Sequence, residues 1–109
     1  MTAITIYQSK SGDYRRLLCK GHAGYARAGK DIVCASVSVL VINTINSLEA
    51  LAQEKIEVVS DEEKGIIDCS FIGELSDKGR LLMDSLILGL ENIEGSYDKK
   101  YLELNFEEV

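Results

Sequence analysis

His22 and Cys34 are the side chains in this sequence best suited to covalent chemistry. His22 is the only histidine, and Cys34 is one of three cysteines. A cysteine attacks a carbonyl group as its thiolate, and a nearby imidazole can accept the thiol proton and later return it to a leaving amine. The segment between the two is rich in glycine and alanine, so it could move over a substrate. The pair therefore indicates a nucleophilic Cys–His dyad.

The position of Cys34 relative to a predicted helix strengthens this interpretation. Asp31 is a favourable N-cap for a helix that the apolar pattern predicts over residues 32–53. Cys34 would then lie in the first turn, where the helix dipole favours a thiolate and free N–H groups could stabilise an oxyanion. Asp31 could also orient His22 and so complete a triad. Ser38, one turn after Cys34, could line a pocket or allow close packing.

Simpler interpretations of His22 and Cys34 are also compatible with their residue types. A cysteine on a helix rich in valine and alanine can be a small core residue, because free cysteine is among the most buried residue types. His22 can equally be a surface residue at the end of a strand. Residue types and spacing alone do not decide between a reactive pair and two packing residues.

A metal site is not expected. Cys19, His22, Cys34 and Cys69 do not have the spacing of a zinc finger or ribbon. Cys19 and His22 lie three residues apart on a predicted strand, so they would point to opposite faces. Cys69 alternates with apolar neighbours and is typical of a core residue. The sequence also lacks the glycine pattern of a P-loop or Rossmann motif, so we expect no cofactor.

Five strands and two helices are expected to position these side chains. Alternating residues predict strands over 2–8, 14–22, 55–60, 65–72 and 99–106, and helical spacing predicts helices over 32–53 and 77–93, with Ser76 capping the second. Leu51 and Phe106 are expected to face the core. The order ββαββαβ predicts an α+β two-layer sandwich, with two helices on a mainly antiparallel sheet. The 109 residues are expected to form a single domain, 1–109.

The composition of the chain limits its expected cellular location and the classes of molecule that it could bind. A net charge of -6 with scattered basic residues argues against direct binding of nucleic acid. The N-terminus does not resemble a signal peptide. The longest apolar stretch, which starts at Ile32, is interrupted by polar residues, so we expect it to be too short and too polar to span a membrane. Three cysteines without C-x-x-C spacing indicate reduced thiols and a cytoplasmic location.

The run GHAGYA…GKDIVCASVSVL, which contains both His22 and Cys34, resembles the Prp family of bacterial ribosomal-processing cysteine proteases. That family shares the pattern G-H-A…G-x-D-I-V-C-A-x-V-S. The likeness extends over nearly the whole chain, including the late segment GLENIEGSYDKKYLEL. Ser36 stands where many members have alanine, a departure that leaves both reactive residues in place.

The resemblance implies a specific activity. The family's catalytic cysteine falls on Cys34 and its catalytic histidine on His22. Members remove a short apolar N-terminal extension, ending in aromatic residues, from large-subunit ribosomal protein number twenty-seven, and they are typically homodimers. We therefore expect a cysteine endopeptidase that binds an extended apolar peptide in a groove or by strand addition. The alternatives are a non-catalytic dimeric binding module for ribosome biogenesis and a thiol-based acyl or redox enzyme.

Overall fold

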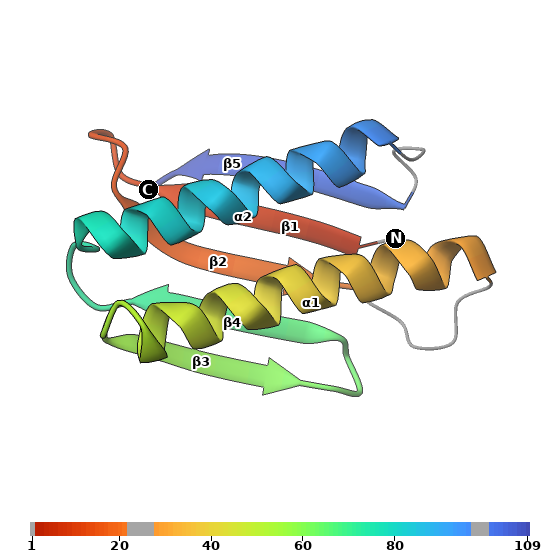
Figure 1. The fold of residues 1–109 in the computed structure, drawn as a ribbon, viewed down its shortest axis with the longest axis horizontal. Coiled ribbons are helices and arrows are strands. Elements are labelled where there is room, and N and C mark those ends of the chain that lie inside the picture. Colours follow the sequence, from red (N-terminus) through yellow and green to blue (C-terminus); the bar gives the residue numbers. More distant parts are fainter. Residues whose placement is uncertain (1, 22–27, 97–100) are drawn as a thin grey trace.

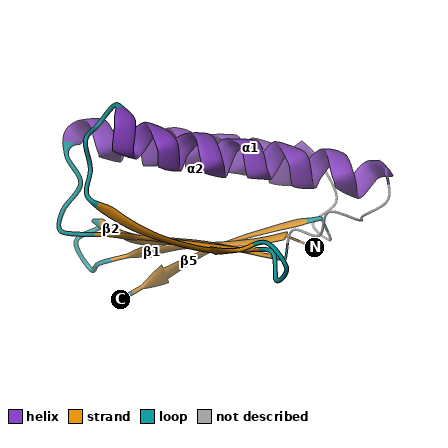
Figure 2. Ribbon diagram, turned by 90° about the horizontal axis from the view of Figure 1, so that it is seen from below, coloured by secondary structure: helices purple, strands orange, loops and turns teal. Residues whose placement is uncertain are grey.

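The computed structural model describes the chain apart from residues 1, 22–27 and 97–100. Its elements follow the predicted order ββαββαβ, as β1 (Thr2–Gln8), β2 (Tyr14–Lys20), α1 (Ala28–Ala50), β3 (Ile56–Asp61), β4 (Ile66–Phe71), α2 (Asp77–Ser96) and β5 (Leu102–Glu108) (Figure 1). Both helices lie on one face of the sheet (Figure 2). The predicted α+β two-layer sandwich is confirmed.

The sheet has five strands in the order β3-β4-β2-β1-β5. The pairs β1–β2, β2–β4 and β3–β4 are antiparallel, whereas β1 and β5 are parallel. The sheet is thus mixed and mainly antiparallel. The first and last strands of the chain lie side by side, from the pair Thr2–Leu102 to the pair Gln8–Glu108, with β5 at the edge of the sheet.

The core lies between the sheet and the helices. Each strand and helix contributes apolar side chains to it. Among the described residues, the fully buried ones are Ile4, Ile6, Leu17, Cys19, Val33, Val37, Val41, Leu48, Cys69, Met83, Leu86, Leu90 and Leu102. Burying one such aliphatic side chain stabilises the fold by roughly 1.5–3 kcal/mol. Leu17 and Cys19 share the helix-facing side of β2, as the alternation predicts, and Cys69 is a core residue.

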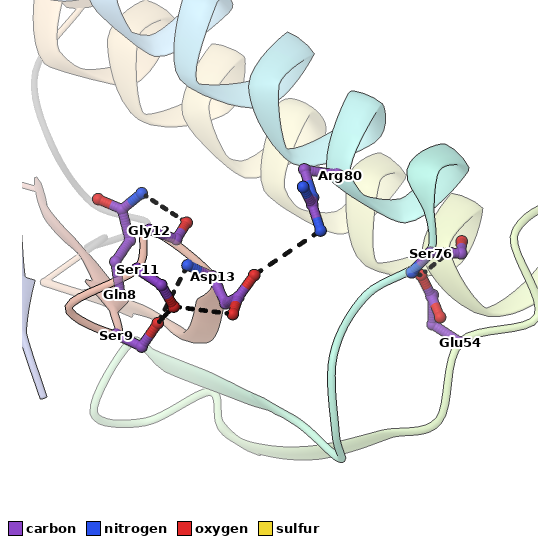
Figure 3. A network of polar contacts seen from close by, with 8 residues as sticks. All are labelled: Gln8, Ser9, Ser11, Gly12, Asp13, Glu54, Ser76 and Arg80. Carbon is purple, nitrogen blue, oxygen red and sulfur yellow. Dashed lines mark hydrogen bonds and ion pairs between the residues drawn. The ribbon is translucent and has the colours of Figure 1, made fainter.

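The end of the molecule away from the start of α1 is fixed by polar contacts (Figure 3). Ser76 caps α2 as predicted, because its hydroxyl accepts a hydrogen bond from the N–H of Gly79 at 3.2 Å. The N–H and hydroxyl of Ser76 both donate to Glu54 Oε2, at 2.8 and 2.9 Å. Arg80 lies 3.7 Å from Asp13 in the β1–β2 turn. These contacts join the first hairpin, the segment after α1 and the start of α2.

Two core predictions are wrong at the ends of elements. Leu51 is 66 % exposed because α1 ends at Ala50 and the chain then reverses through Gln53, which has φ 51°. Phe106 is 49 % exposed, since it lies in the second half of the edge strand β5. There the twist of the sheet carries the strand away from the helices (Figure 2).

Helix α1 is more apolar than expected. By length and composition its segment Ile32–Ala50, with mean hydropathy 1.6, could cross a membrane, so the expectation that this stretch is too short and too polar is wrong. The core helix of a folded domain passes the same test. In this structure Val33, Val37 and Val41 of α1 are packed into the core with the sheet. The apolar composition is thus explained in part by packing.

Candidate active site

Cys34 lies in α1 on the side that meets the sheet. Its side chain is half-buried, and its neighbours Val33 and Val37 are fully buried. The Cys34 Sγ atom lies 3.8 Å from the hydroxyl oxygen of Thr2, at the start of β1. Cys34 therefore sits at the margin of the core, where the sulfur is held by packing and is still accessible from outside.

The other two cysteines are sealed in the core. Burial raises the pKa of Cys19 to about 11, and the negative charge of Cys34 adds to that effect. Burial, followed by the charges of Asp68 and Glu49, raises the pKa of Cys69 to about 12. A thiol that is buried and protonated is a poor nucleophile. Of the three free cysteines, Cys34 is thus the one suited to reaction.

β2 ends beside the start of β1. β2 ends at Lys20, which pairs with Ala3, so the predicted continuation of this strand through residue 22 is wrong at Gly21. Gly21 has φ 84°, a conformation that favours glycine, and its N–H donates to the carbonyl of Gly65 at 3.0 Å. The next residue, His22, lies outside the described residues. The end of β2, the start of β1 and the early turns of α1 meet at one end of the molecule (Figure 1).

The start of α1 differs from the prediction. The helix begins at Ala28, so Asp31 lies in its first turn and is not its N-cap. Cys34 is then beyond the first turn, where its N–H has a carbonyl partner four residues earlier. The dipole of a helix acts mainly on its first turn. The proposed help from free N–H groups and from the dipole is therefore not supported at Cys34.

A groove runs between α1 and the β3–β4 hairpin, starting one turn after Cys34. Its volume is about 540 Å³, and its lining combines aliphatic side chains with polar and acidic ones. The lining residues are Ser38, Ile42, Ile45, Asn46, Val58, Ser60, Asp61, Glu62, Ile66 and Ile67. Ser38 thus lines a pocket, the first of the two roles foreseen for it. The volume of the groove is within the range of small-ligand sites, so it could hold apolar side chains of a peptide.

The contact of Thr2 with Cys34 was not foreseen from the sequence, nor was the place of Asp61 and Glu62 in the groove lining. Alternation in β1 places Thr2 on the face of Ile4 and Ile6, but its contact with Cys34 depends on how α1 packs on the sheet. Among the residues that the structure describes, no group of three His, Cys, Asp or Glu side chains could hold a metal ion.

Comparison with known proteins places the chain among proteases. The sequence matches the family described as cysteine protease Prp over residues 1–102. The ribosomal processing cysteine protease Prp of Bacillus subtilis (strain 168) is 31% identical over 101 residues, which cover 89% of this chain and 90% of that protein.

Two crystal structures of an essential ribosomal processing protease Prp from S. aureus share the fold. One is a complex with a substrate peptide, with a TM-score of 0.90 and 23% identity. The other has a covalently linked product peptide, with a TM-score of 0.87 and 24% identity. Each comparison covers 98% of this chain and 100% of that chain.

Proposed function

Because the chain belongs to the cysteine protease Prp family, we propose that it is an endopeptidase in which Cys34 is the nucleophile and His22 the general base. The observation that carries the assignment is the contrast between the thiols: Cys34 is half-buried, whereas Cys19 is sealed in the core. Cys69 is sealed in the same way. An attacking thiol must reach a carbonyl carbon, which only an accessible sulfur can do.

The assignment of His22 is supported by the strand that precedes it. Gly21 is anchored to Gly65, and Lys20 pairs with Ala3, next to the residue that contacts Cys34. His22 follows this anchored residue directly in the sequence. We assign Asp31, in the first turn of α1, a supporting role in orienting the imidazole.

The reaction follows the usual course of a thiol protease. His22 accepts the proton of the Cys34 thiol, and the sulfur forms a C–S bond to the peptide carbonyl carbon. The C–N bond breaks, and the amine leaves with the proton from His22. A water molecule then gives a proton to His22 and attacks the thioester, so the C–S bond breaks and the free acid is released. These steps need no cofactor.

The proposed substrate is the apolar N-terminal extension of large-subunit ribosomal protein number twenty-seven. The relatives are ribosomal processing proteases, which supports a ribosomal substrate, and the aliphatic side chains in the groove lining suit an apolar peptide. We further propose that the protein works in the cytoplasm as a homodimer, without binding nucleic acid or a membrane directly.

Cleavage of a peptide that spans this extension and the mature start of the ribosomal protein tests the proposal. Wild type, Cys34→Ala and His22→Ala are compared by mass spectrometry, and Ser36→Ala, a helix residue next but one to Cys34, serves as a matched control. We expect one cut by wild type and by the control, and at least a thousandfold loss in the other two variants. A folded wild type that cuts none of several such peptides would instead favour the non-catalytic binding module.

A further inference from the structure

Thr2 presents a buried hydroxyl group to the sulfur of Cys34. The residue is only 3 % exposed. Among the residues that the structure describes, Cys34 Sγ is the hydrogen-bond partner of its hydroxyl oxygen, at 3.8 Å. Buried hydroxyl groups are almost always hydrogen-bonded, because an unpaired one is costly. The contact therefore gives the buried Thr2 hydroxyl a hydrogen-bond partner, and that partner is the sulfur of Cys34.

The backbone holds Thr2 firmly in this place. Its N–H donates to the carbonyl of Tyr101 at 3.0 Å, and it pairs with Leu102 of the parallel neighbour β5. Threonine is β-branched, which restricts the rotation of its side chain. On the opposite side, Val33 and Val37 anchor the turn of α1 that carries Cys34. Both partners of the contact are thus fixed by rigid elements, as a preorganised site requires.

The chemistry of a thiolate sets the direction of this hydrogen bond. Either atom could donate while Cys34 is a thiol. A thiolate has no proton, so the Thr2 hydroxyl must then be the donor. A hydrogen bond to an ion is stronger than one between neutral groups, particularly in a partly buried place. The contact consequently stabilises the thiolate more than the thiol.

We propose that Thr2 is a positioning residue for the nucleophile, donating a hydrogen bond that favours the Cys34 thiolate and fixes its sulfur beside the start of β1. The inference rests on the proposed role of Cys34. The proposed hydrogen bond predicts a characteristic dependence of the reaction rate on pH. A stabilised thiolate is more abundant at pH values below the midpoint of the thiol titration, but each thiolate is slightly less nucleophilic. Loss of the hydroxyl should therefore slow the reaction at low pH and leave it equal or slightly faster at high pH.

Alkylation of Cys34 by iodoacetamide from about pH 5 to about pH 10 measures this dependence, since that interval spans the titration of thiols. Thr2→Val removes the hydroxyl at nearly constant shape, and Thr2→Ser keeps it. Thr44→Val is the matched control. Thr44 is a buried threonine like Thr2, but it lies in α1, roughly 15 Å along the helix axis from Cys34. Labelled peptides are counted by mass spectrometry, and kcat and KM for peptide cleavage are measured beside them.

We expect Thr2→Val to move the midpoint of the rate–pH curve upward by about half a unit to one unit, and to lower kcat/KM at neutral pH by about three- to tenfold. Thr2→Ser and Thr44→Val should keep the wild-type curve. Thr2→Ala is a second variant without the hydroxyl, and it provides the same test if Thr2→Val does not fold.

Other results overturn the inference. An unchanged midpoint in a folded hydroxyl-free variant excludes Thr2 as a positioning residue and leaves the proposed function intact if Cys34→Ala is inactive. A loss of rate by the same factor at every pH assigns Thr2 to packing alone. If wild type neither cleaves peptides nor labels faster at Cys34 than at Cys19, the proposed function fails, and the role of Thr2 fails with it.

Discussion

The three cysteines should differ sharply in their reaction with alkylating reagents, and the structure sets the scale of the difference. The pKa is raised to about 11 at Cys19 and to about 12 at Cys69. At pH about 8 a thiol with the ordinary pKa of about 8.5 is roughly one quarter ionised, so these two thiols carry roughly 200-fold and 2,000-fold less thiolate than an ordinary one. Burial also keeps the reagent away from both.

Pulsed alkylation with and without denaturant measures this difference. In the native protein, a short pulse of iodoacetamide should label Cys34 at least a hundredfold faster than Cys19 or Cys69, as peptide mass spectrometry will report. In concentrated urea all three should react at similar rates. Cys34→Ser is the control, and its folded form should take up almost no label during the pulse.

Labelling of Cys19 or Cys69 in the native protein at a rate within tenfold of Cys34 would refute the reasoning. That result would mean that the core opens often enough to expose β2 or β4, or that the packing around them is looser than the structure shows. The contrast between one accessible thiol and two sealed ones, on which the choice of nucleophile depends, would then be lost.

Two further predictions concern stability. The pKa values of Cys19 and Cys69 are higher in the folded chain than the unfolded value of about 8.5, so folding favours the neutral thiols. Raising the pH from about 8 to about 10 should therefore lower the free energy of unfolding by roughly 2 kcal/mol per thiol. Urea titration at the two pH values measures this change. In α2, the new methyl group of Gly95→Ala meets open space, so this variant should stabilise the fold by up to about 0.5 kcal/mol. A Cβ at Gly79 would lie 1.9 Å from Glu54 Oε2, so Gly79→Ala should cost about 1 kcal/mol more than the gain in helix propensity. This extra cost must vanish in a Glu54→Ala background.

The local rules of sequence predicted the elements well where the pattern was periodic. Alternation in β2 placed Leu17 and Cys19 on the core face, and Ser76 marked the start of α2 correctly. The match between these signals and the structure reflects their physical basis, since pleating alternates side chains and a hydroxyl satisfies a free N–H of a helix. The family of the chain was also recognisable from the run that contains Cys34, and the match over residues 1–102 confirms it.

The ends of elements were harder to predict. Asp31 is a strong capping residue, and the segment before it contains glycine, so the sequence favoured a helix start there; the helix begins at Ala28 instead. Exposure of Phe106 depends on sheet twist at an edge, which no local pattern encodes. The contact between Thr2 and Cys34 joins the first strand to a helix and exists only once the two layers pack.

The early start of α1 changes what must stabilise the thiolate of Cys34. With Ala28 as the first helical residue, the backbone N–H groups around Cys34 have partners within the helix, and the sulfur is past the turn where the dipole is strongest. Free N–H groups and the dipole of α1 are therefore not the groups that we propose to stabilise this thiolate. The described contact is the Thr2 hydroxyl of β1, and the proposed base, His22, follows the anchored end of β2. We therefore propose that α1 carries the nucleophile, and that the Thr2 hydroxyl of β1 and His22 activate it.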